Sequence, residues 1–582
     1  MKSLLRLRPY FKRYKNAVLQ GVVYIMLSTV FAVIAPVLIR RVIDDLEHDI
    51  SSGALLQYAL LILAVSAVSG VFMYLTRQTL IVTSRYIEYD LRNDFLKHLQ
   101  LLSQRYFMTT STGDLMAYST NDIAAVRMFV GPAVMYTSNT VFSFIIIVGM
   151  MLSIHPLLTL YALLPLPLLS FAVNRLGKLI HKRFEEIQGQ YAILTSRTQE
   201  SISGIRVVKA YLREAHETSV FRMLSEDYRM KNMRMIRIQS LFMPMLALLV
   251  GVSVILIIWL GGREVILGSI SLGELTQFLI YLGMLIWPMA AIGWVVNLIQ
   301  RAAASMKRLE NVFSSVPDIS DGPDTDYSIQ EIKGDIRFEQ VSFRYAESSP
   351  TILNDISLHI PTGETLGIIG MTGAGKSTLI NLIPRLYDAT AGVVRVDGHD
   401  ITRIPLDTLR GGIACVPQET FLFSDSIRNN IAYGVDDASE DEIRWAAQIA
   451  QIDKDIVDFP RGYDTVLGER GITLSGGQKQ RVSLARAILR KPSILILDDA
   501  LSAVDTHTEE DILAGLREVM LERTSLLISH RISTVRHANH IIVMRDGSII
   551  ESGTHEQLLH LDGMYADLHR KQLLAEELEE IE

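Results

Sequence analysis

The hydrophobic residues of this chain gather in its first half, in long stretches without Asp, Glu, Lys or Arg. These charge-free stretches are 17–39, 54–76, 128–174, 239–262 and 275–300. A membrane-spanning helix needs about 20 apolar residues, so the third stretch is long enough for two helices. The pattern therefore predicts six transmembrane helices, near 17–39, 54–76, 131–153, 156–174, 240–262 and 275–300.

Charge between these stretches predicts the orientation. Residues 1–16 carry Lys and Arg but no acidic residue, whereas acidic residues outnumber basic ones in the loop that follows 17–39. The positive-inside rule then places the N-terminus in the cytoplasm, and six crossings return the chain there. We expect a multi-pass protein of the cytoplasmic (inner) membrane. A cleaved signal peptide is the alternative for 17–39, but this stretch exceeds the usual apolar region of about 7–15 residues.

Two polar stretches, at about 77–127 and 175–238, have helical periodicity and ample charge. They predict helices that continue well beyond the bilayer on its cytoplasmic side. After the last apolar stretch, residues 314–326 are rich in Ser, Pro, Asp and Gly, which is typical of a linker. Short β-rich runs then alternate with helical patterns, as in a parallel α/β domain. The predicted organisation is a membrane domain over 1–320, a linker over 321–334 and a second domain over 335–582.

Composition narrows the class of protein. The chain has 582 residues, of which 49% are hydrophobic, and a mean hydropathy of +0.26, which favours a membrane protein. Its net charge of −7 gives no general attraction to nucleic acid. The single cysteine, Cys415, excludes an internal disulfide framework, and we expect it to be a small buried core residue.

The segment GMTGAGKST, residues 370–378, matches the phosphate-binding pattern G-x-x-x-x-G-K-[ST]. A strand-like run precedes it and a helix-like run follows it, which is the context that the motif requires. Backbone N–H groups and the helix N-terminus would surround the phosphates, Lys376 would reach the β- and γ-phosphates, and Ser377 would ligate Mg²⁺. The predicted ATP-binding residues here are Gly370, Thr372, Gly373, Gly375, Lys376, Ser377 and Thr378.

A second metal ligand is expected at the end of the apolar run ILILDD. Asp498 ends a strand of the kind that is buried on both faces. A carboxylate at this position would hold Mg²⁺ beside the phosphate loop. The alternative is that Asp498 only caps the next helix.

The segment LSGGQKQR, residues 474–481, precedes an apolar helix. Taken alone, Ser475 could be an ordinary helix N-cap. With the phosphate loop upstream and Asp498 downstream, however, the chain resembles the ATP-binding cassette (ABC) family over essentially its whole length. The resemblance implies the layout of an ABC exporter half-transporter, with a membrane α-helical domain fused to an α/β P-loop ATPase domain.

The resemblance also implies roles for individual residues. Tyr345 would stack on adenine, Gln418 would contact Mg²⁺ and the attacking water, and His530 would contact the γ-phosphate. The signature residues Ser475, Gly476, Gly477 and Gln478 and the D-loop residue Asp505 would complete the nucleotide site of a partner chain. Segments 110–127 and 200–214 match coupling helices, and 468–471 matches the segment that reports to them. The alternatives are a core aromatic for Tyr345, an ordinary loop residue for Gln418 and a structural role for His530.

Asp499 departs from the family pattern, which usually has Glu at this position. The catalytic residues implied are Asp499, His530 and Gln418, and the metal ligands are Ser377, Gln418 and Asp498. Because Asp is one methylene shorter than Glu, we expect this site to bind ATP and hydrolyse it slowly. With its intact signature, the chain resembles the BmrC/MdlA-like multidrug branch of asymmetric heterodimeric exporters, in which a partner chain would supply the Glu.

The membrane helices limit the cargo. They are poor in charge, which disfavours a small ion and fits an amphiphile such as a drug or a lipid. In the last helix, Met284, Trp287, Met289 and Trp294 would line an apolar cavity or, alternatively, pack against neighbouring helices or lipid. No N-terminal Cys/His protease pattern is present, which argues against a peptide-maturing exporter. A homodimeric exporter or lipid flippase that tolerates Asp499, a regulatory ATP-binding subunit and a nucleotide-gated channel remain as alternatives.

Overall fold

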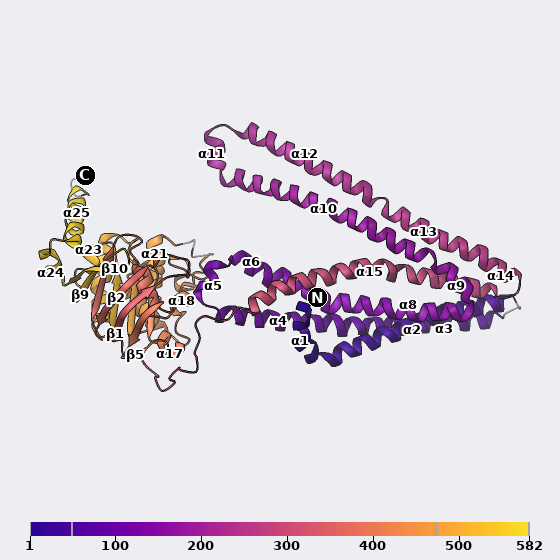
Figure 1. Cartoon of the computed structure of the whole chain (residues 1–582), viewed down its shortest axis with the longest axis horizontal. Coiled ribbons are helices and arrows are strands. Elements are labelled where there is room, and N and C mark those ends of the chain that lie inside the picture. Colours follow the sequence, from indigo (N-terminus) through magenta and orange to yellow (C-terminus); the bar gives the residue numbers. More distant parts are fainter. Residues whose placement is uncertain (1, 48–50, 469–470, 472–473, 580–582) are drawn as a thin grey trace. The chain divides into compact units, whose positions relative to one another are not determined.

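The computed structural model describes residues 2–47, 51–468, 471 and 474–579 (Figure 1). The chain divides into two compact units. The membrane unit comprises Met1–Gln100 and Thr112–Ser315, and the ATPase unit comprises Leu101–Ser111 and Val316–Glu582. A short segment between two membrane-unit helices therefore belongs to the compact body of the ATPase unit.

The described part of the membrane unit is entirely helical. Its α-helices are α1 (Arg8–Arg13), α2 (Lys15–Leu46), α3 (Ser52–Thr76), α4 (Val82–Leu101), α6 (Thr112–Ala117), α7 (Ile123–Met128), α8 (Val134–Ile154), α9 (Pro156–Leu163), α10 (Pro165–Ser203), α11 (Ile205–Ala210), α12 (Glu214–Gln239), α13 (Phe242–Leu256), α14 (Gly262–Ile266) and α15 (Leu272–Phe313). Short π-helical turns join several of them into longer helices, for example at Arg77–Ile81 between α3 and α4.

Within the described residues, five of these continuous helices are long and apolar enough to cross a membrane. The sixth predicted span, 156–174, is divided between α9 and α10 at Leu164. Pro165 explains the division, because proline has no N–H to donate to the preceding turn. The apolar residues of this span are thereby shared between two helices.

The core of the membrane unit lies where α2, α8 and α15 pack together. Phe278, Tyr281 and Leu285 of α15 are fully buried there. Two buried polar side chains of α15 are linked there: the Tyr281 hydroxyl donates to the carbonyl of Val33 at 3.1 Å, and Gln277 Nε2 donates to that hydroxyl at 2.9 Å. These hydrogen bonds offset part of the cost of burying polar groups in an apolar interior.

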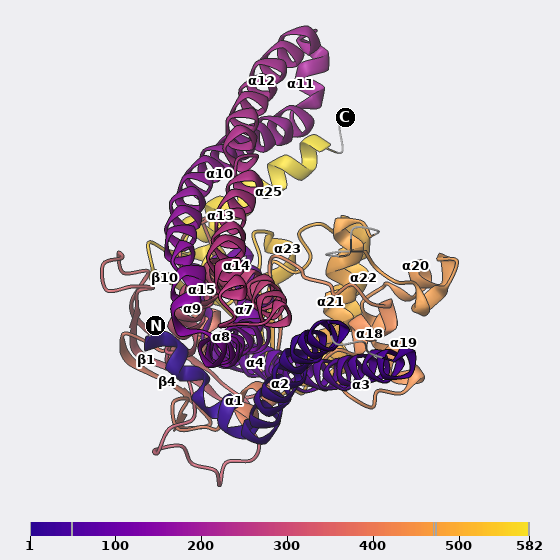
Figure 2. The ribbon, with the colours of Figure 1, turned by 90° about the vertical axis from the view of Figure 1, so that its right-hand side faces the viewer.

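The helices α10 and α12 form an arm that extends away from the other helices of the membrane unit (Figures 1 and 2). The two helices lie side by side and are joined by two side-chain contacts. Lys231 Nζ donates to Gln190 Oε1 at 2.8 Å, and Arg197 and Glu217 form an ion pair of 2.6 Å. The helix α12 has no buried residue. The predicted coupling segment 200–214 includes α11, at the far end of this arm.

The ATPase unit contains two sheets. Its strands are β1 (Ile336–Phe343), β2 (Leu353–Ile360), β3 (Thr365–Gly370), β4 (Ala391–Val396), β5 (His399–Asp400), β6 (Ile413–Val416), β7 (Ile494–Asp498), β8 (Thr524–Ile528), β9 (His540–Arg545) and β10 (Ser548–Gly553). Its helices are α5 (Gln104–Thr109), α16 (Lys376–Leu382), α17 (Leu406–Gly411), α18 (Ile427–Ala432), α19 (Glu440–Ile449), α20 (Asp453–Asp458), α21 (Gly476–Leu489), α22 (Thr506–Met520), α23 (Ile532–Val535), α24 (His555–His560) and α25 (Met564–Glu579).

The smaller sheet has the antiparallel order β2-β1-β4-β5, and the larger has the order β10-β9-β3-β8-β7-β6. In the larger sheet β6, β7, β8, β3 and β9 pair in parallel. Every residue of β3, β7 and β8 is buried, as expected for parallel strands covered on both faces. The predicted fold class, a helical membrane domain fused to an α/β P-loop domain, is confirmed.

The prediction for Cys415 is wrong. This residue lies on β6, and its side chain is exposed. Side chains alternate between the two faces of a strand, so Cys415 points to the face opposite that of its neighbours, and this face is open at the edge strand β6. The residues on either side of Cys415, Ala414 and Val416, are buried in the core.

Candidate active site

Four of the predicted site segments follow the carboxyl ends of neighbouring parallel strands. The phosphate loop follows β3, His530 follows β8, Asp498 and Asp499 end β7, and Gln418 follows β6. The order β3-β8-β7-β6 brings these four ends together along one edge of the sheet. In open α/β sheets, ligands bind at such an edge.

The phosphate loop depends on glycine at defined points. Gly375 has φ of 96° and stands directly before α16, in a left-handed conformation that favours glycine. A Cβ on Gly370 would lie 2.3 Å from the carbonyl oxygen of Met544, so no side chain fits there. Lys376 Nζ donates to the carbonyls of Gly370 at 2.8 Å and Met371 at 3.1 Å, which holds the ammonium inside the loop.

The charges around the loop act on one another. Burial lowers the pKa of Lys376, and the nearby carboxylates of Asp498 and Asp499 counteract this effect. Burial also raises the pKa of Asp498, and a hydrogen bond from Ser377 opposes that shift. The Asp498 side chain is only 6% exposed, so its charge needs a partner.

The donor set fits Mg²⁺. The Ser377 hydroxyl and the Asp498 carboxylate meet through a hydrogen bond, and both are hard oxygen ligands of the kind that Mg²⁺ prefers. Among the described residues, no group of three or more His, Cys, Asp or Glu side chains is placed to hold a metal. The predicted ligand Gln418, phosphate and water would therefore supply the remaining ligands, since Mg²⁺ usually binds through few protein ligands in nucleotide sites.

Asp499 lies beside this set in an unusual backbone conformation. Its φ is 49°, in the left-handed region that Asp and Asn enter more easily than most residues. Its N–H donates to the carbonyl of Ile528 at 2.9 Å, which fixes the turn at the end of β7. Its carboxylate is close enough to Lys376 and Asp498 to shift the pKa of both groups.

Tyr345 lies just after β1, and its hydroxyl reaches α16, the helix that follows the phosphate loop. Its hydroxyl is hydrogen-bonded to Thr378 Oγ1 at 2.9 Å, and its ring is half-buried. Its ring packs edge-on against that of Tyr387, with centroids 5.2 Å apart. The predicted adenine-stacking residue is therefore held beside the phosphate loop.

The side chains of Gln418 and His530 are exposed, and in the described part of the chain neither makes a hydrogen bond. His530 nevertheless acts to lower the pKa of Asp498, so its ring lies near this carboxylate. Asp505 accepts a hydrogen bond from the N–H of Thr508 at 2.9 Å and caps α22. The structure thus brings the phosphate loop and the Asp498 carboxylate, which are the Walker motifs of this family, together. It leaves Gln418, His530 and Asp505 facing solvent.

The signature segment forms the start of α21. Ser475 and Gln478 exchange hydrogen bonds of 3.2 and 3.0 Å in a capping box, so the N-cap alternative for Ser475 describes its contacts within this chain. A Cβ on Gly477 would lie 2.8 Å from the carbonyl oxygen of Ala503, so this glycine lets the D-loop approach the signature helix. In the predicted segment 468–471, residues 469 and 470 lie outside the described residues.

Two residues that the sequence analysis did not select tie these segments together. Gln480 donates to Ser502 Oγ at 3.0 Å and accepts from the N–H of Ala503 at 2.9 Å, which joins the signature helix to the D-loop. Glu509 accepts hydrogen bonds from Arg531 and Thr534, which joins α22 to the loop of His530. Gln480 stood within the quoted motif, but no sequence signal identified Glu509.

Two family matches cover most of the chain. The family described as "ABC transporter transmembrane region" matches residues 18–289, and the one described as "ABC transporter" matches residues 353–502. The chain belongs to the ABC transporter family. It joins one membrane region to one ATPase domain, as an ABC exporter half-transporter does.

Individual ABC proteins match almost the full length. The chain is 39% identical over 567 residues to the "Probable multidrug resistance ABC transporter ATP-binding/permease protein YheI" of Bacillus subtilis (strain 168), covering 97% of both chains. It is 36% identical over 582 residues to the "Multidrug resistance-like ATP-binding protein MdlA" of Escherichia coli (strain K12), covering 100% of this chain and 98% of the relative. Over 572 residues it is 37% identical to the "ATP-dependent lipid A-core flippase" of Syntrophus aciditrophicus (strain SB), covering 98% and 94%.

A solved structure confirms the architecture. The "Structure of a bacterial Atm1-family ABC exporter with ATP bound" superposes with a TM-score of 0.80 at 27% identity, covering 96% of this chain and 99% of that one. The whole chain, including both units, therefore has the fold of an ABC exporter.

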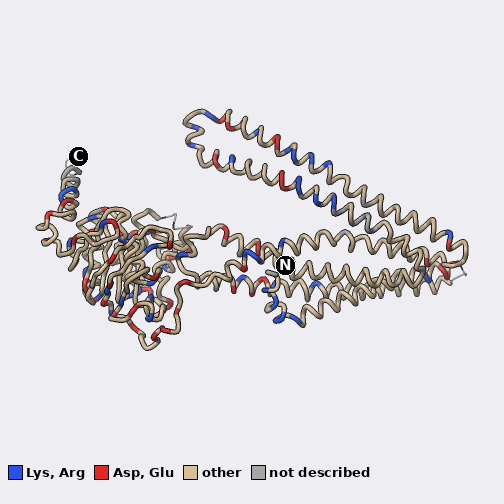
Figure 3. The backbone as a smooth tube through the Cα atoms, viewed as in Figure 1, with Lys and Arg blue, Asp and Glu red and all other residues tan. Residues whose placement is uncertain are grey.

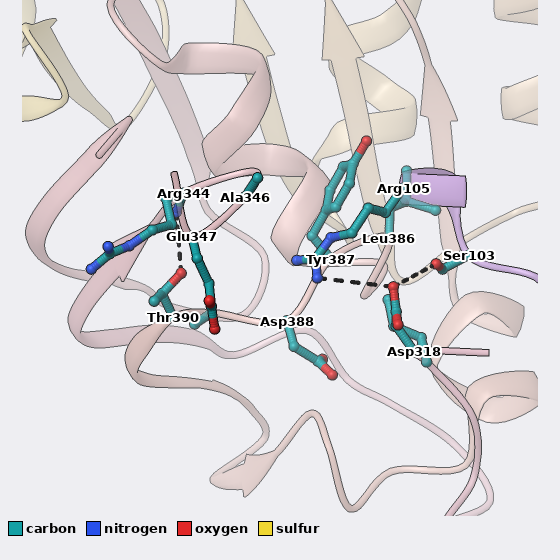
Figure 4. A pocket seen from close by; sticks show the side chains of 12 residues that line it. Ser103, Arg105, Asp318, Arg344, Ala346, Glu347, Leu386, Tyr387, Asp388 and Thr390 are labelled. Atoms are coloured by element: carbon teal, nitrogen blue, oxygen red, sulfur yellow. Dashed lines mark hydrogen bonds and ion pairs between the residues drawn. The ribbon is translucent and has the colours of Figure 1, made fainter. Parts of the chain in front are cut away.

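In this ABC half-transporter, α5 packs within the ATPase unit against Tyr387, the ring neighbour of Tyr345. The Tyr387 hydroxyl donates to Met108 Sδ at 3.1 Å, and Ser103 Oγ donates to Asp318 at 3.1 Å. A pocket of about 700 Å³ opens beside these contacts (Figure 4). Arg105, 3.9 Å from Asp318, lies on its wall. The Tyr345 ring thus contacts the Tyr387 ring, and Tyr387 contacts Met108. Met108 lies in the segment Leu101–Ser111, whose two ends continue into the membrane unit.

The stacking role of Tyr345 predicts the effect of removing its ring. Tyr345→Ala should raise the Kd for ATP on the order of tenfold, because stacking of a base on an aromatic ring contributes about 1–3 kcal/mol. Tyr345→Phe is the matched control, since it keeps the ring and removes only the hydrogen bond to Thr378. Titration with a fluorescent ATP analogue measures both. Equal Kd values for wild type and Tyr345→Ala would show that Tyr345 is a core aromatic.

Proposed function

We propose that this chain is one half of an ATP-driven heterodimeric exporter of amphiphilic compounds and that its own nucleotide site hydrolyses ATP slowly. The observation that carries the proposal is Asp499. It follows the buried strand β7 at the position where the family usually has Glu, while the other nucleotide motifs are complete.

Side-chain length is the physical reason for slow hydrolysis. A carboxylate that polarises the attacking water contributes about 10²–10⁴-fold to the rate. Asp is one methylene shorter than Glu, so the carboxylate is withdrawn by about 1 Å, and a misplacement of that size can cost about 100-fold. The backbone of Asp499 is held in a left-handed conformation with φ of 49°, which limits how far its carboxylate can reach toward the attacking water.

The signature side of the chain supports pairing with a different partner. Ser475, Gly477 and Gln478 are all present, and the capping box gives the start of α21 a defined geometry. A partner chain that carries the usual Glu would place its Walker motifs against this signature and form the competent site. The Walker motifs of this chain would face the partner's signature in the slow site.

The membrane unit supports an amphiphilic cargo. The spans near 17–39 and 275–300 contain no Asp, Glu, Lys or Arg, and ion pathways usually do contain such residues. Trp287 is 67% exposed on α15, where it can meet an apolar compound. Full-length relatives carry names that refer to multidrug resistance. A homodimer that tolerates Asp499, a regulatory ATP-binding subunit and a nucleotide-gated channel are the alternatives.

Lengthening one side chain tests the slow site. Asp499→Glu should raise ATP turnover of the chain, assembled as a dimer in lipid nanodiscs, by about 10- to 100-fold, because the longer carboxylate reaches the attacking water. Asp499→Asn, which removes the charge without changing the size, should not raise it. Thermal unfolding of the same samples shows whether Glu is less stable in the left-handed conformation. Unchanged turnover in folded Asp499→Glu would mean that position 499 does not limit hydrolysis.

A lipid with an anionic headgroup is the second candidate cargo, and the charges of the arm favour it. Residues 174–184 and 228–241, next to the membrane spans, contain several Lys and Arg but no Asp or Glu (Figure 3). Within the described residues, five of these cations are exposed and make no ion pair: Arg175, Lys178, Lys182, Arg234 and Arg237. We define these five as the basic band. Basic clusters directly cytoplasmic of a membrane helix attract anionic lipid, at about 1 kcal/mol per charge.

Neutralising the basic band tests this second candidate. The triple variant Lys178→Gln, Lys182→Gln and Arg234→Gln should reduce ATP-dependent flipping of fluorescent phosphatidylglycerol about tenfold or more, since three attractions of about 1 kcal/mol are lost. The control variant Arg206→Gln with Arg222→Gln removes two exposed charges nearer the tip of the arm. Unaltered flipping in the triple variant would contradict a headgroup role for the band, and transport of a drug without flipping would favour a drug as cargo.

A further inference from the structure

The loop that carries His530 is held by a residue far along the chain. Gln572 of α25 donates from Nε2 to the main-chain carbonyl of His530 at 2.6 Å, and its Oε1 accepts from the N–H of Ile532 at 2.8 Å. One amide group thus bridges the backbone on both sides of Arg531. Among the described residues, no other hydrogen bond to the main chain of His530 is present.

The opposite side of this loop is fixed to the body of the ATPase unit. Glu509 is 2% exposed and accepts from Thr534 Oγ1 at 2.6 Å and from Arg531. Ser529 Oγ accepts from the N–H of Arg531 at 2.9 Å. These contacts fix the residues before and after His530. The carbonyl of His530 itself depends on Gln572.

The helix α25 is anchored so that Gln572 reaches this position. Tyr565, at its start, is fully buried, and its N–H donates to Glu551 at 3.0 Å. Leu568 packs against the core, and Gln572 follows at the spacing i, i+3, i+7 that lines one helix face. The anchored face of α25 therefore ends in an amide aimed at the loop.

We propose that Gln572 is a positioning residue for His530 and that the C-terminal helix α25 thereby sets the direction of the histidine ring toward the γ-phosphate. The two hydrogen bonds of the Gln572 amide fix the backbone after His530. A fixed backbone fixes the direction in which the Cα–Cβ bond of His530 points. This proposal rests on the role that the family resemblance implies for His530. It does not depend on Asp499 or on the choice of partner.

A comparison of the Kd values for AMP-PNP and ADP shows whether Gln572 positions His530 or only stabilises the fold. His530 would contact only the γ-phosphate, which AMP-PNP has and ADP lacks. Gln572→Leu should therefore weaken binding of the non-hydrolysable analogue AMP-PNP with Mg²⁺ by about 3- to 10-fold, the effect of losing the hydrogen bond between His530 and the γ-phosphate. The Kd for ADP should stay within about twofold. The full-length chain in nanodiscs is the sample. Lys571→Gln, which changes the adjacent exposed residue, is the matched control and should change neither Kd.

A double-mutant cycle shows whether Gln572 acts through the histidine. In the His530→Ala background, Gln572→Leu should cause no further loss of AMP-PNP affinity. Gln572→Glu is the second variant, in case the leucine variant does not fold. Its carboxylate can accept from Ile532 but cannot donate to the carbonyl of His530, so it should give the same selective loss.

Turnover gives an independent reading. In the faster of the wild type and Asp499→Glu, Gln572→Leu should lower kcat about tenfold or more, because a displaced group loses rate. The KM for ATP should rise by no more than the about 3- to 10-fold increase expected in the Kd for AMP-PNP. Equal loss of ADP and AMP-PNP affinity, additive loss in the His530→Ala background, or no loss in a folded variant would each overturn the proposal.

Discussion

The buried carboxylate of Asp498 is the constraint on which the nucleotide site depends. A carboxylate that is 6% exposed at the end of an apolar strand is tolerated only with partners, and the structure supplies the Ser377 hydroxyl and the Lys376 ammonium, with His530 nearby. These partners come from strands β3 and β8 on the same sheet. Because the strands are parallel and adjacent, satisfying one carboxylate places the phosphate loop, the metal position and the histidine loop within reach of one another.

The left-handed backbone of Asp499 adds a second constraint at the same strand end. Asp is among the residues that enter this conformation most easily, so the sequence that departs from the family pattern also suits the local backbone. Catalytic reach and backbone preference thus favour different residues at position 499. The proposed asymmetric pair of chains would resolve the conflict, since only one of its sites would need the longer carboxylate.

The sequence predicted the elements whose signals are contiguous. The charge-free stretches predicted the five long apolar helices. The motifs around Lys376, Ser475 and Asp498 predicted the ATPase domain, and the nucleotide roles of these residues stay predictions. It did not predict features that arise from tertiary contacts. Glu509 and Gln572 lie 22 and 42 residues from their partners Arg531 and His530, with no local pattern to mark them. The exposure of Cys415 depends on which face of the edge strand β6 is left uncovered, which tertiary packing determines.

The most direct test of the central claim is the ATPase rate of this chain, purified alone in lipid nanodiscs, with its oligomeric state counted in the same sample. The account predicts a monomer or weak dimer that binds ATP and barely hydrolyses it, because the competent site needs the Glu of a partner. A stable homodimer with a turnover on the order of 1–10 s⁻¹, typical of enzymes, would contradict it and establish Asp499 as a competent base.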